Sequence, residues 1–344
     1  MSFIAIGDLH LKNKYLENNK KCLFSCLDTI NKIKNKYNIE LFDFIVILGD
    51  VYDTHNMVEC TCLKLFDYFL NKVCEYTNQV FIIIGNHDVK NPKELFSDTH
   101  AFNSYKKSSI NVKIVDKIYS WNKFLFIPYV DINEDLFSLL DEYNKNWMNE
   151  YISVFSHIEI KDFYLAKNYK SKNGFVWKDT YPQLISGHLH HYQKENNVLY
   201  IGSVYKSEFI QQKSINNYIC LGTYDDEKLI SIEKKKLDIK NNIIMNTNLQ
   251  NIKHDYKQLD LNNNIRIIFY YKNNELEIFK NSDLYLIIKN NENIQFLHVK
   301  DKPYMVDNKN NVNLCYKDIF YENININKNK NDILNTMKKY NILI

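Results

Sequence analysis

Four short strings in the sequence join a glycine to side chains that can bind a metal ion. The strings are Gly7-Asp8-Leu9-His10, Gly49-Asp50-Val51-Tyr52-Asp53, Gly85-Asn86-His87-Asp88 and Gly187-His188-Leu189-His190. Each follows a short run rich in Ile, Val, Leu or Phe, which is typical of a buried strand. Because open α/β sheets bind ligands at the carboxyl ends of their strands, we expect the four strings to meet at one metal centre.

The side chains available there offer imidazole nitrogens, carboxylate oxygens and an amide oxygen. The candidate ligands are Asp8, His10, Asp50, Asn86, His157, His188 and His190. This mixture suits Mn, Fe or Zn and does not suit a calcium cage. Since one ion takes about four to six ligands and Asp50 can bridge, the set indicates two divalent ions, which would activate a hydroxide for in-line phosphoryl displacement.

The elements that must position these residues alternate between strand and helix up to about residue 236. Helices are expected at 16–37, 57–76, 92–105 and 134–147. Strands are expected at 3–6, 44–48, 80–84, 112–115, 124–127, 152–155, 184–186, 198–201, 218–222 and 229–232. This order predicts an α/β fold with a two-layered mixed β-sheet core flanked by helices.

The Asn-rich segment 237–251 breaks the alternation and predicts a domain boundary. We therefore expect a large domain over 1–240, a small α+β unit over 241–313 and a helical tail over 314–344. Strand-like runs within the small unit lie at 264–271, 284–288 and 297–299. The tail has two short apolar faces, too little to form a core alone.

Composition narrows the possible partners and compartments. A net charge of +3 excludes a globally basic surface, so a nucleic-acid partner would need a local positive one. The odd number of cysteines favours a reducing compartment, with Cys22, Cys26, Cys60 and Cys62 as buried or half-buried thiols and a shared structural zinc as the alternative. The apolar start is too short for a leader or membrane segment. We expect an intracellular protein, cytoplasmic or nucleoid-associated and not secreted.

The ordered motifs resemble those of the calcineurin-like metallophosphoesterases, and within them the SbcD-like nuclease subunits of DNA double-strand-break-processing complexes. The narrower resemblance rests on Gly49-Asp50-Val51-Tyr52-Asp53-Thr54, Ile127-Pro128-Tyr129, Ser186-Gly187-His188-Leu189-His190 and Tyr200-Ile201-Gly202-Ser203. It covers residues 1 to about 236, and the remainder only in its layout of a cap followed by a tail. Val204 stands where relatives often have proline. This difference lies outside the metal ligands, so it bears on the shape of the substrate and not on catalysis. The A/T-biased composition fits a viral or phage version.

The resemblance implies a division of the ligands between two metal ions, with Mn²⁺ as the expected ion. The ligands of the first would be Asp8, His10, Asp50 and His190. The ligands of the second would be Asp50, Asn86, His157 and His188. It further implies that His87 protonates the leaving oxygen and that Asp53 is the acidic partner of His87.

The implied function is that of a metal-dependent DNA exonuclease and endonuclease in DNA repair and recombination. DNA and an SbcC-like coiled-coil ATPase would be its partners, the tail docking on the coiled coil or else packing back onto the cap. A homodimer could form through the helices expected at 57–76 and 92–105, unless their apolar residues only cover the sheet. The alternatives are a dinuclear-metal phosphatase or phosphodiesterase acting on a non-DNA substrate, and a non-catalytic scaffold, against which the complete ligand set argues.

Overall fold

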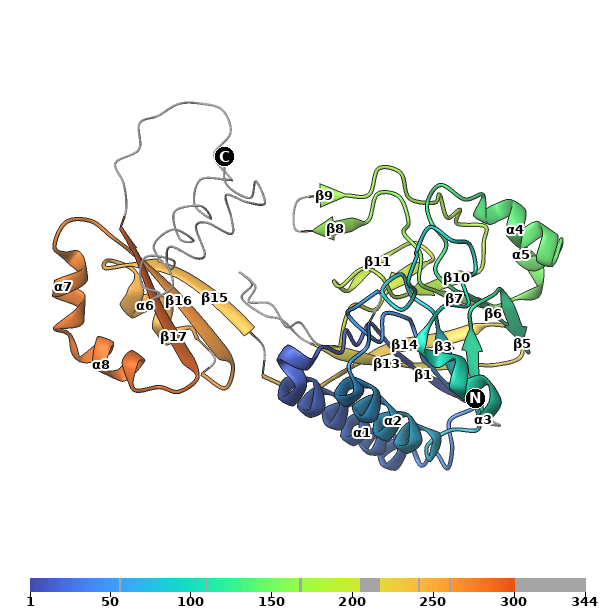
Figure 1. The fold of residues 1–344 in the computed structure, drawn as a ribbon, viewed down its shortest axis with the longest axis horizontal. Helices are drawn as coiled ribbons and strands as arrows, with labels where there is room; N and C mark the ends of the chain where they lie inside the picture. Colours follow the sequence, from blue (N-terminus) through green and yellow to red (C-terminus); the bar gives the residue numbers. More distant parts are fainter. Residues whose placement is uncertain are drawn as a thin grey trace. The chain divides into compact units, whose positions relative to one another are not determined.

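The computed structural model describes residues 1–55, 57–108, 111–166, 169–204, 217–240, 242–259 and 261–300. The chain divides into two compact units, Met1–Asn242 and Ile243–Ile344 (Figure 1). The expected tail at 314–344, the end of the expected cap and their docking roles lie outside the described residues. Within those residues, no helix has both the length and the apolar character needed to span a bilayer.

Two sheets form the centre of the first unit. The first has the order β14-β13-β1-β2-β3-β4 and contains β1 (Ser2–Ile6), β2 (Phe44–Ile47), β3 (Val80–Ile83), β4 (Val112–Val115), β13 (Tyr218–Tyr224) and β14 (Leu229–Lys236). The second has the order β11-β12-β10-β7-β6-β5 and contains β5 (Tyr119–Trp121), β6 (Phe124–Ile127), β7 (Ser153–Ser156), β10 (Gln183–Ser186), β11 (Gln193–Glu195) and β12 (Val198–Tyr200). Strands β1 to β4 are mutually parallel, as are β6, β7, β10 and β12, with antiparallel strands at the edges. The predicted two-layered mixed core is confirmed.

Alternate side chains of each strand point to opposite faces of the sheet and pack in different core clusters. In β1, Phe3 faces the second sheet, whereas its neighbour Ile4 packs in the cluster under the helices. Phe44 of β2 stacks on Phe3 at 4.9 Å and meets Phe155 of the second sheet edge-on at 5.5 Å. Burial on both faces explains why these strands read as continuous apolar runs and lack alternation.

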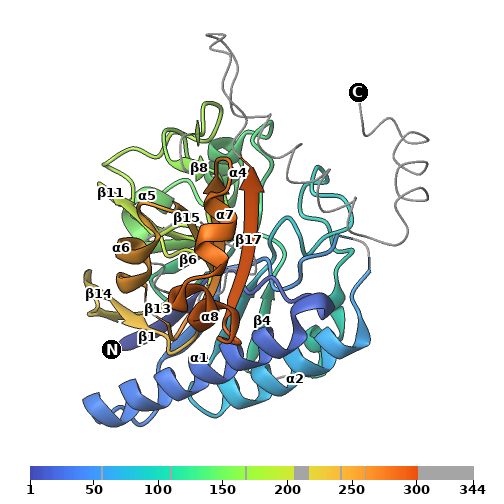
Figure 2. The same ribbon diagram turned by 90° about the vertical axis from the view of Figure 1, so that its left-hand side faces the viewer.

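Helices cover the outer faces of both sheets. Helices α1 (Leu16–Tyr37) and α2 (Cys60–Cys74) lie side by side against the first sheet (Figure 2). Helices α4 (Leu136–Tyr143) and α5 (Trp147–Glu150) pack on the second. Shorter elements are η1 (Asn13–Tyr15), η2 (Ala101–Ser104), α3 (Tyr105–Ser108) and the hairpin β8 (Tyr164–Ala166) with β9 (Tyr169–Lys170). The helix expected at 16–37 is confirmed, and the one expected at 57–76 is shorter.

Two helix predictions fail because local hydrogen bonds compete with the helical ones. Within the range expected at 92–105, residues 92–100 do not form a helix and the helical part begins at Ala101. In the first part, Asn91 Oδ1 accepts from the Lys93 N–H at 3.3 Å, and Ser97 Oγ accepts from the Thr99 N–H at 3.3 Å. The helix expected at 134–147 ends early, because Asn144 is extended and its Oδ1 accepts from the Asn146 N–H at 2.9 Å. The expected burial of Cys60 is also wrong, since this thiol is exposed.

The second unit has a sheet with the order β15-β16-β17. Its elements are β15 (Asn242–Asn248), α6 (Ile252–Lys257), β16 (Asn264–Tyr271), α7 (Glu275–Lys280), α8 (Asp283–Lys289) and β17 (Ile294–Lys300). The strand expected at 264–271 is confirmed, and the one expected at 297–299 is longer. The strand expected at 284–288 is wrong: Ser282 Oγ caps a helix there by accepting from the Tyr285 N–H at 3.3 Å.

Candidate metal centre

The candidate ligands follow parallel strands of both sheets. Asp8 and His10 follow β1, Asp50 follows β2, and Asn86 follows β3. From the second sheet, His157 directly follows β7, while His188 and His190 follow β10. Because β1–β2–β3 and β7–β10 run parallel, their carboxyl ends present these side chains at corresponding edges of the two sheets.

Tight backbone approach brings the loops together. A Cβ at Gly85 would overlap the Asp50 carboxylate, and one at Gly187 would overlap the Leu48 carbonyl and come within 2.6 Å of Asp8 Oδ1. Three of the candidate ligands adopt left-handed backbone conformations, namely His10 (φ 45°), Asp50 (φ 48°) and His188 (φ 77°). Such conformations are costly for residues other than glycine and concentrate at functional sites.

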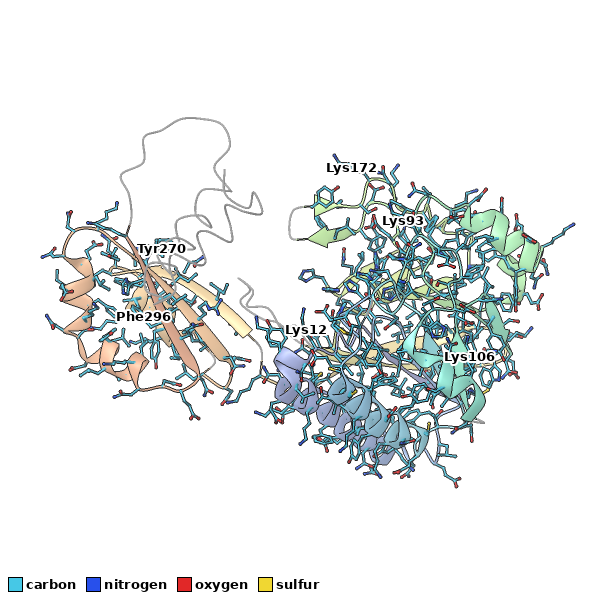
Figure 3. The ribbon with its side chains drawn as sticks, in the orientation of Figure 1. Lys12, Lys93, Lys106, Lys172, Tyr270 and Phe296 are labelled. Carbon is cyan, nitrogen blue, oxygen red and sulfur yellow. The ribbon has the colours of Figure 1, made fainter. Side chains whose placement is uncertain are left out.

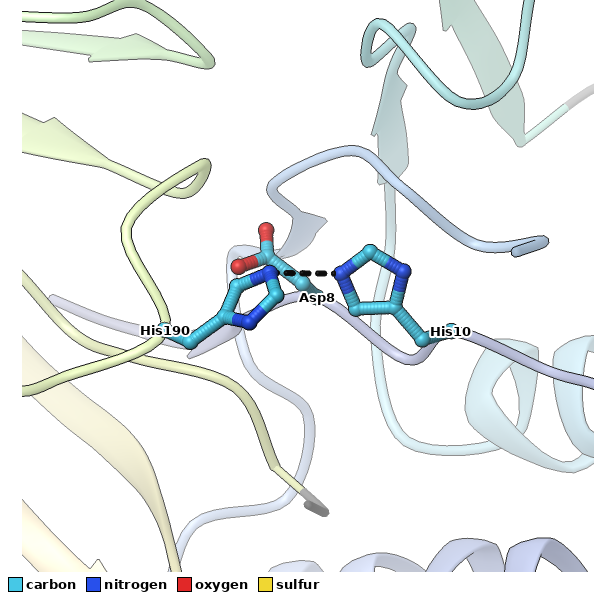
Figure 4. Close-up of side chains that lie close together, drawn as sticks. All are labelled: Asp8, His10 and His190. Carbon is cyan, nitrogen blue, oxygen red and sulfur yellow. Dashed lines mark hydrogen bonds between the residues drawn. The ribbon is translucent and has the colours of Figure 1, made fainter. Parts of the chain in front are cut away.

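A first cluster joins Asp8, His10 and His190, whose possible ligand atoms all lie within 4.8 Å of one another. The two imidazoles point toward each other, with His10 Nε2 2.9 Å from His190 Nε2 (Figure 4). Asp8 is fully buried, and its Oδ2 has no hydrogen-bond partner. These atoms provide a carboxylate and two imidazoles for one ion.

A second cluster joins Asp50, His157 and His188 around the amide of Asn86. Asn86 Oδ1 lies 2.9 Å from His188 Nδ1 and 3.2 Å from His157 Nε2. Asp50 Oδ2 lies 3.2 Å from His157 Nε2 and 3.8 Å from His10 Nε2. Asp50 thus faces both clusters, as a bridging carboxylate must.

The hydrogen bonding of His157 tests whether the residues fit a metal ion. Its Nδ1 lies 2.6 Å from the carbonyl oxygen of Leu48 and donates to it. In the neutral ring, Nε2 then carries a lone pair that points at Asn86 Oδ1 and Asp50 Oδ2. Three acceptors that converge in a buried site need a cation or a proton among them, so the donor set fits a divalent ion.

The electrostatics of the buried groups agree with a cation site. Although burial acts to raise it, the pKa of Asp50 is held far below its usual range by the charge and hydrogen bond of His157, and by His10 and His87. Burial alone would lower the pKa of His157, but Asp50 and Asp8 raise it to about 9. The centre therefore holds a strong negative potential that favours positive charge.

His87 stands at the edge of the centre, with 31% of its side chain exposed. Its backbone N–H donates to Asp50 Oδ1 at 2.8 Å, and its ring meets that of His10 edge-on at 5.1 Å. Burial lowers its pKa, against the opposing charge of Asp50. A histidine fixed beside Asp50 and partly open to solvent could reach a substrate bound at the centre.

Asp53 lies closer to His10 than to His87. Its Oδ1 is 4.0 Å from His87 Nδ1, beyond hydrogen-bond reach, but 3.3 Å from His10 Nδ1. Its Oδ2 accepts from Lys12 Nζ at 2.5 Å. Hydrogen bonds from His10 and Lys12 hold its pKa well below the usual range, against the effect of burial.

Sequence reasoning gave no role to several neighbours of the ligands. The ring of His55 stacks on that of His87 at 4.6 Å, and its Nδ1 is 2.9 Å from the Asn86 carbonyl oxygen. Glu159 Oε2 is 3.8 Å from His188 Nε2. Lys12 and Glu159 each lie two residues after a ligand, a spacing that could have signalled them.

Asp88 braces the loops behind the ligands. Its Oδ1 accepts from the Tyr52 N–H at 3.2 Å, and its Oδ2 from the Gly85 N–H at 3.0 Å. Burial and the nearby charge of Asp50 raise its pKa to about 7. Its role is therefore structural, since it joins the loop that carries Asp50 to the loop that carries Asn86.

Comparison with known proteins identifies the family. Residues 1–192, more than half of the chain, match the calcineurin-like phosphoesterase model. The chain is 28% identical over 246 residues (69% of this chain, 82% of the relative) to "Putative phosphoesterase 244L" of Invertebrate iridescent virus 6. It is 26% identical over 249 residues (70% of this chain, 68% of the relative) to "Putative phosphoesterase 078R" of Invertebrate iridescent virus 3. With its ligand clusters at the strand ends, the chain belongs to the calcineurin-like phosphoesterases, which hydrolyse phosphoesters with divalent metal ions.

Proposed function

We propose that the protein is a metal-dependent DNA exonuclease and endonuclease that acts in DNA repair and recombination, with Mn²⁺ as its metal. The supporting observation is that segments of SbcD-like sequence border the metal centre. The Ser203 N–H donates to the His190 carbonyl at 3.3 Å. The Tyr129 ring lies 5.8 Å from that of His188.

Different residues of the chain would hold the metal ions and protonate the leaving oxygen during hydrolysis. Two divalent ions, when bound, supply Lewis-acid stabilisation of the attacking and leaving oxygens. Asp50, which faces both clusters, would hold the ions at a fixed separation. His87 would deliver a proton to the leaving oxygen, because its backbone bond to Asp50 fixes its position while its ring stays accessible.

Aromatic and basic side chains on the β8–β9 hairpin support a nucleic-acid substrate. Tyr164 and Tyr169 are 45% and 55% exposed, and Lys170 Nζ lies 4.8 Å from the Tyr164 ring centre. Lys172 follows at the outer edge of the first unit (Figure 3). The hairpin is tied to the segment after His190, because Gln193 Oε1 accepts from the Tyr164 N–H at 2.8 Å. Stacking rings beside cations are typical of single-strand binding.

A substrate comparison tests the proposal. The full chain, stripped of metal and reloaded with Mn²⁺, is given linear duplex DNA, hairpin-ended DNA, single-stranded DNA and bis(p-nitrophenyl) phosphate. Cleavage of DNA that is lost with EDTA and in His87→Gln supports the nuclease assignment. Hydrolysis of the aryl diester without any DNA cleavage would favour a phosphodiesterase of another substrate. Absence of both activities would favour a scaffold.

We also propose an SbcC-like coiled-coil ATPase as partner, with residues 314–344 as the docking segment. Truncation after Asn313 tests this directly. The truncated protein should keep its melting temperature and its cleavage of the aryl diester while losing the ATPase subunit in a pull-down. A clear fall in melting temperature with partner binding intact would assign the segment to the fold.

The proposed homodimer needs residues that the core does not use. Phe66, Leu70 and Phe102 are buried within the first unit and are not available for a contact. On the outer side of α1 and α2, Phe24 and Tyr68 are 40% and 47% exposed, and their rings meet edge-on at 5.7 Å. We place the proposed contact there. Light scattering of the wild type and of Phe24→Glu at micromolar concentration tests it, and a monomeric wild type would exclude it.

A further inference from the structure

The carboxylate of Glu159 faces the ring nitrogen of His188 that Asn86 does not face. His188 Nδ1 is 2.9 Å from Asn86 Oδ1, whereas its Nε2 is 3.8 Å from Glu159 Oε2. The imidazole thus turns one nitrogen to the metal centre and the other to an acid. At 3.8 Å the second contact is an ion-pair distance, longer than a hydrogen bond.

A buried serine fixes the Glu159 carboxylate. Its Oε1 accepts from Ser171 Oγ at 2.6 Å, and Ser171 is only 1% exposed. Ser171 Oγ in turn accepts from the Gly174 N–H at 3.0 Å. With one oxygen held by this chain of hydrogen bonds, the other is left to face His188.

The backbone around Glu159 is held as firmly. The hydroxyl of the fully buried Tyr200 donates to the Ile158 carbonyl at 2.8 Å and accepts from the Ile160 N–H at 2.9 Å. The Glu159 carbonyl accepts from the Phe175 N–H at 2.9 Å. The carboxylate is therefore part of a built arrangement and is not a freely moving surface side chain.

We propose that Glu159 is a positioning residue of the metal centre. Its negative charge beside Nε2 favours the His188 tautomer that carries the proton there, and this leaves the Nδ1 lone pair to the ion that Asn86, Asp50 and His157 would share. Acidic partners of this kind fix the tautomer and the orientation of a ligating imidazole. The inference rests on His188 being a metal ligand, as the proposed function requires, but not on DNA being the substrate.

Calorimetric titration of the metal-stripped protein with Mn²⁺ is the first test. Glu159→Ala should weaken one of two binding events by about 10- to 100-fold and leave the other within twofold. Glu159→Gln keeps an acceptor oxygen and should recover part of the loss. Ser171→Ala, which frees the carboxylate, should change affinity in the same direction by less.

A matched control comes from His100 and Asp116, which repeat the arrangement away from the metal ligands. His100 Nδ1 accepts from the Phe102 N–H at 3.2 Å, and its Nε2 lies 3.3 Å from Asp116 Oδ2. Asp116→Asn should leave both Mn²⁺ affinities unchanged. An equal loss in this control and in Glu159→Ala would mean that the effect is general destabilisation, which would overturn the proposal.

A spectroscopic readout separates positioning from folding. In the Zn²⁺-loaded protein, the His188 Nε2–H should give a slowly exchanging downfield proton resonance, assigned by its loss in His188→Ala. Glu159→Ala should lose this resonance through faster exchange while its melting temperature stays close to the wild type. An unchanged resonance together with unchanged affinities would refute the role of Glu159. If His188→Ala retained both metal-binding events, the ligand assignment itself would fail instead.

Discussion

The Nδ1 atom of His157 donates to the carbonyl oxygen of Leu48 across 2.6 Å, and this bond determines which ring nitrogen faces the metal centre. Leu48 follows β2 and His157 follows β7, so the bond also joins the two sheets next to the ligands. Since the His157 side chain is fully buried, its Nε2 cannot turn away from Asp50. The packing of the two sheets therefore determines which nitrogen of His157 faces Asp50.

Metal content should distinguish the bridging carboxylate from a ligand of one site. Asp50→Ala removes the oxygen that faces both clusters, so both ions should be lost. His190→Ala removes a ligand of the first cluster only and should lose one ion preferentially. Elemental analysis after desalting measures both. Equal and undiminished metal content in the two variants would exclude this division.

His87→Gln should separate chemistry from metal binding. The backbone N–H that bonds Asp50 remains, so the variant should keep its metal content. Loss of the proton donor should lower cleavage by a factor on the order of 10² or more. The rate on linear duplex DNA under saturating metal measures this, because the alkoxide leaving group of DNA needs a proton, and Asp116→Asn is the unaffected control. A loss smaller than about threefold would mean that His87 is not the acid.

The clustering of the candidate ligands could be predicted from sequence because each of these residues follows its strand within a few residues. Strand runs such as 80–84 are apolar throughout, and glycines stand at the positions where the loops approach one another closely. The partner of Asp53 could not be predicted in this way. Whether its carboxylate meets His10, Lys12 or His87 depends on side-chain packing between separate loops.

Glu159 and the failed elements show the same limit. The position of Glu159 is fixed by hydrogen bonds from Ser171 to its carboxylate and from Tyr200 to the adjoining backbone, and neither residue is a near neighbour in the sequence. The run 284–288 is too short for the spacing of its apolar residues to distinguish a strand from a helix. The helix forms there because Ser282 caps its first turn. Strand β15 lies in an Asn-rich segment whose composition indicates a linker, yet Met245 packs in the core of the second unit.

Phe44 should be among the most costly core positions of the first unit. It is fully buried and contacts rings from both sheets, including Phe3, Phe124 and Phe155. Phe44→Ala leaves a cavity between the sheets and should lower the free energy of unfolding by about 3–5 kcal/mol. Urea unfolding measures the loss. Met57→Ala, at a side chain that is 76% exposed, should change it by less than about 0.5 kcal/mol. Similar values for the two would contradict the placement of the core.

The contacts of Asp116 should make stability depend on pH in the acid range. Although burial acts to raise it, hydrogen bonds from His100 and Lys106 lower the pKa of Asp116 from its ordinary 3.8 to about 2. The folded state thus binds this proton more weakly than the unfolded chain. The stabilisation is fully present above the ordinary pKa and is lost as the pH falls through about 2.

Asp116→Asn tests this dependence because the variant cannot ionise at that position. Near pH 6 it should be less stable than the wild type by roughly 1 kcal/mol, a modest value since solvent screens a partly exposed carboxylate. As the pH falls from about 4 toward 2, the wild type should lose this advantage and the two unfolding free energies should converge. Urea unfolding of both proteins at a series of pH values measures the difference. A difference that stays constant down to about pH 2 would mean that the substitution costs stability through packing alone, and that the ion pair contributes nothing.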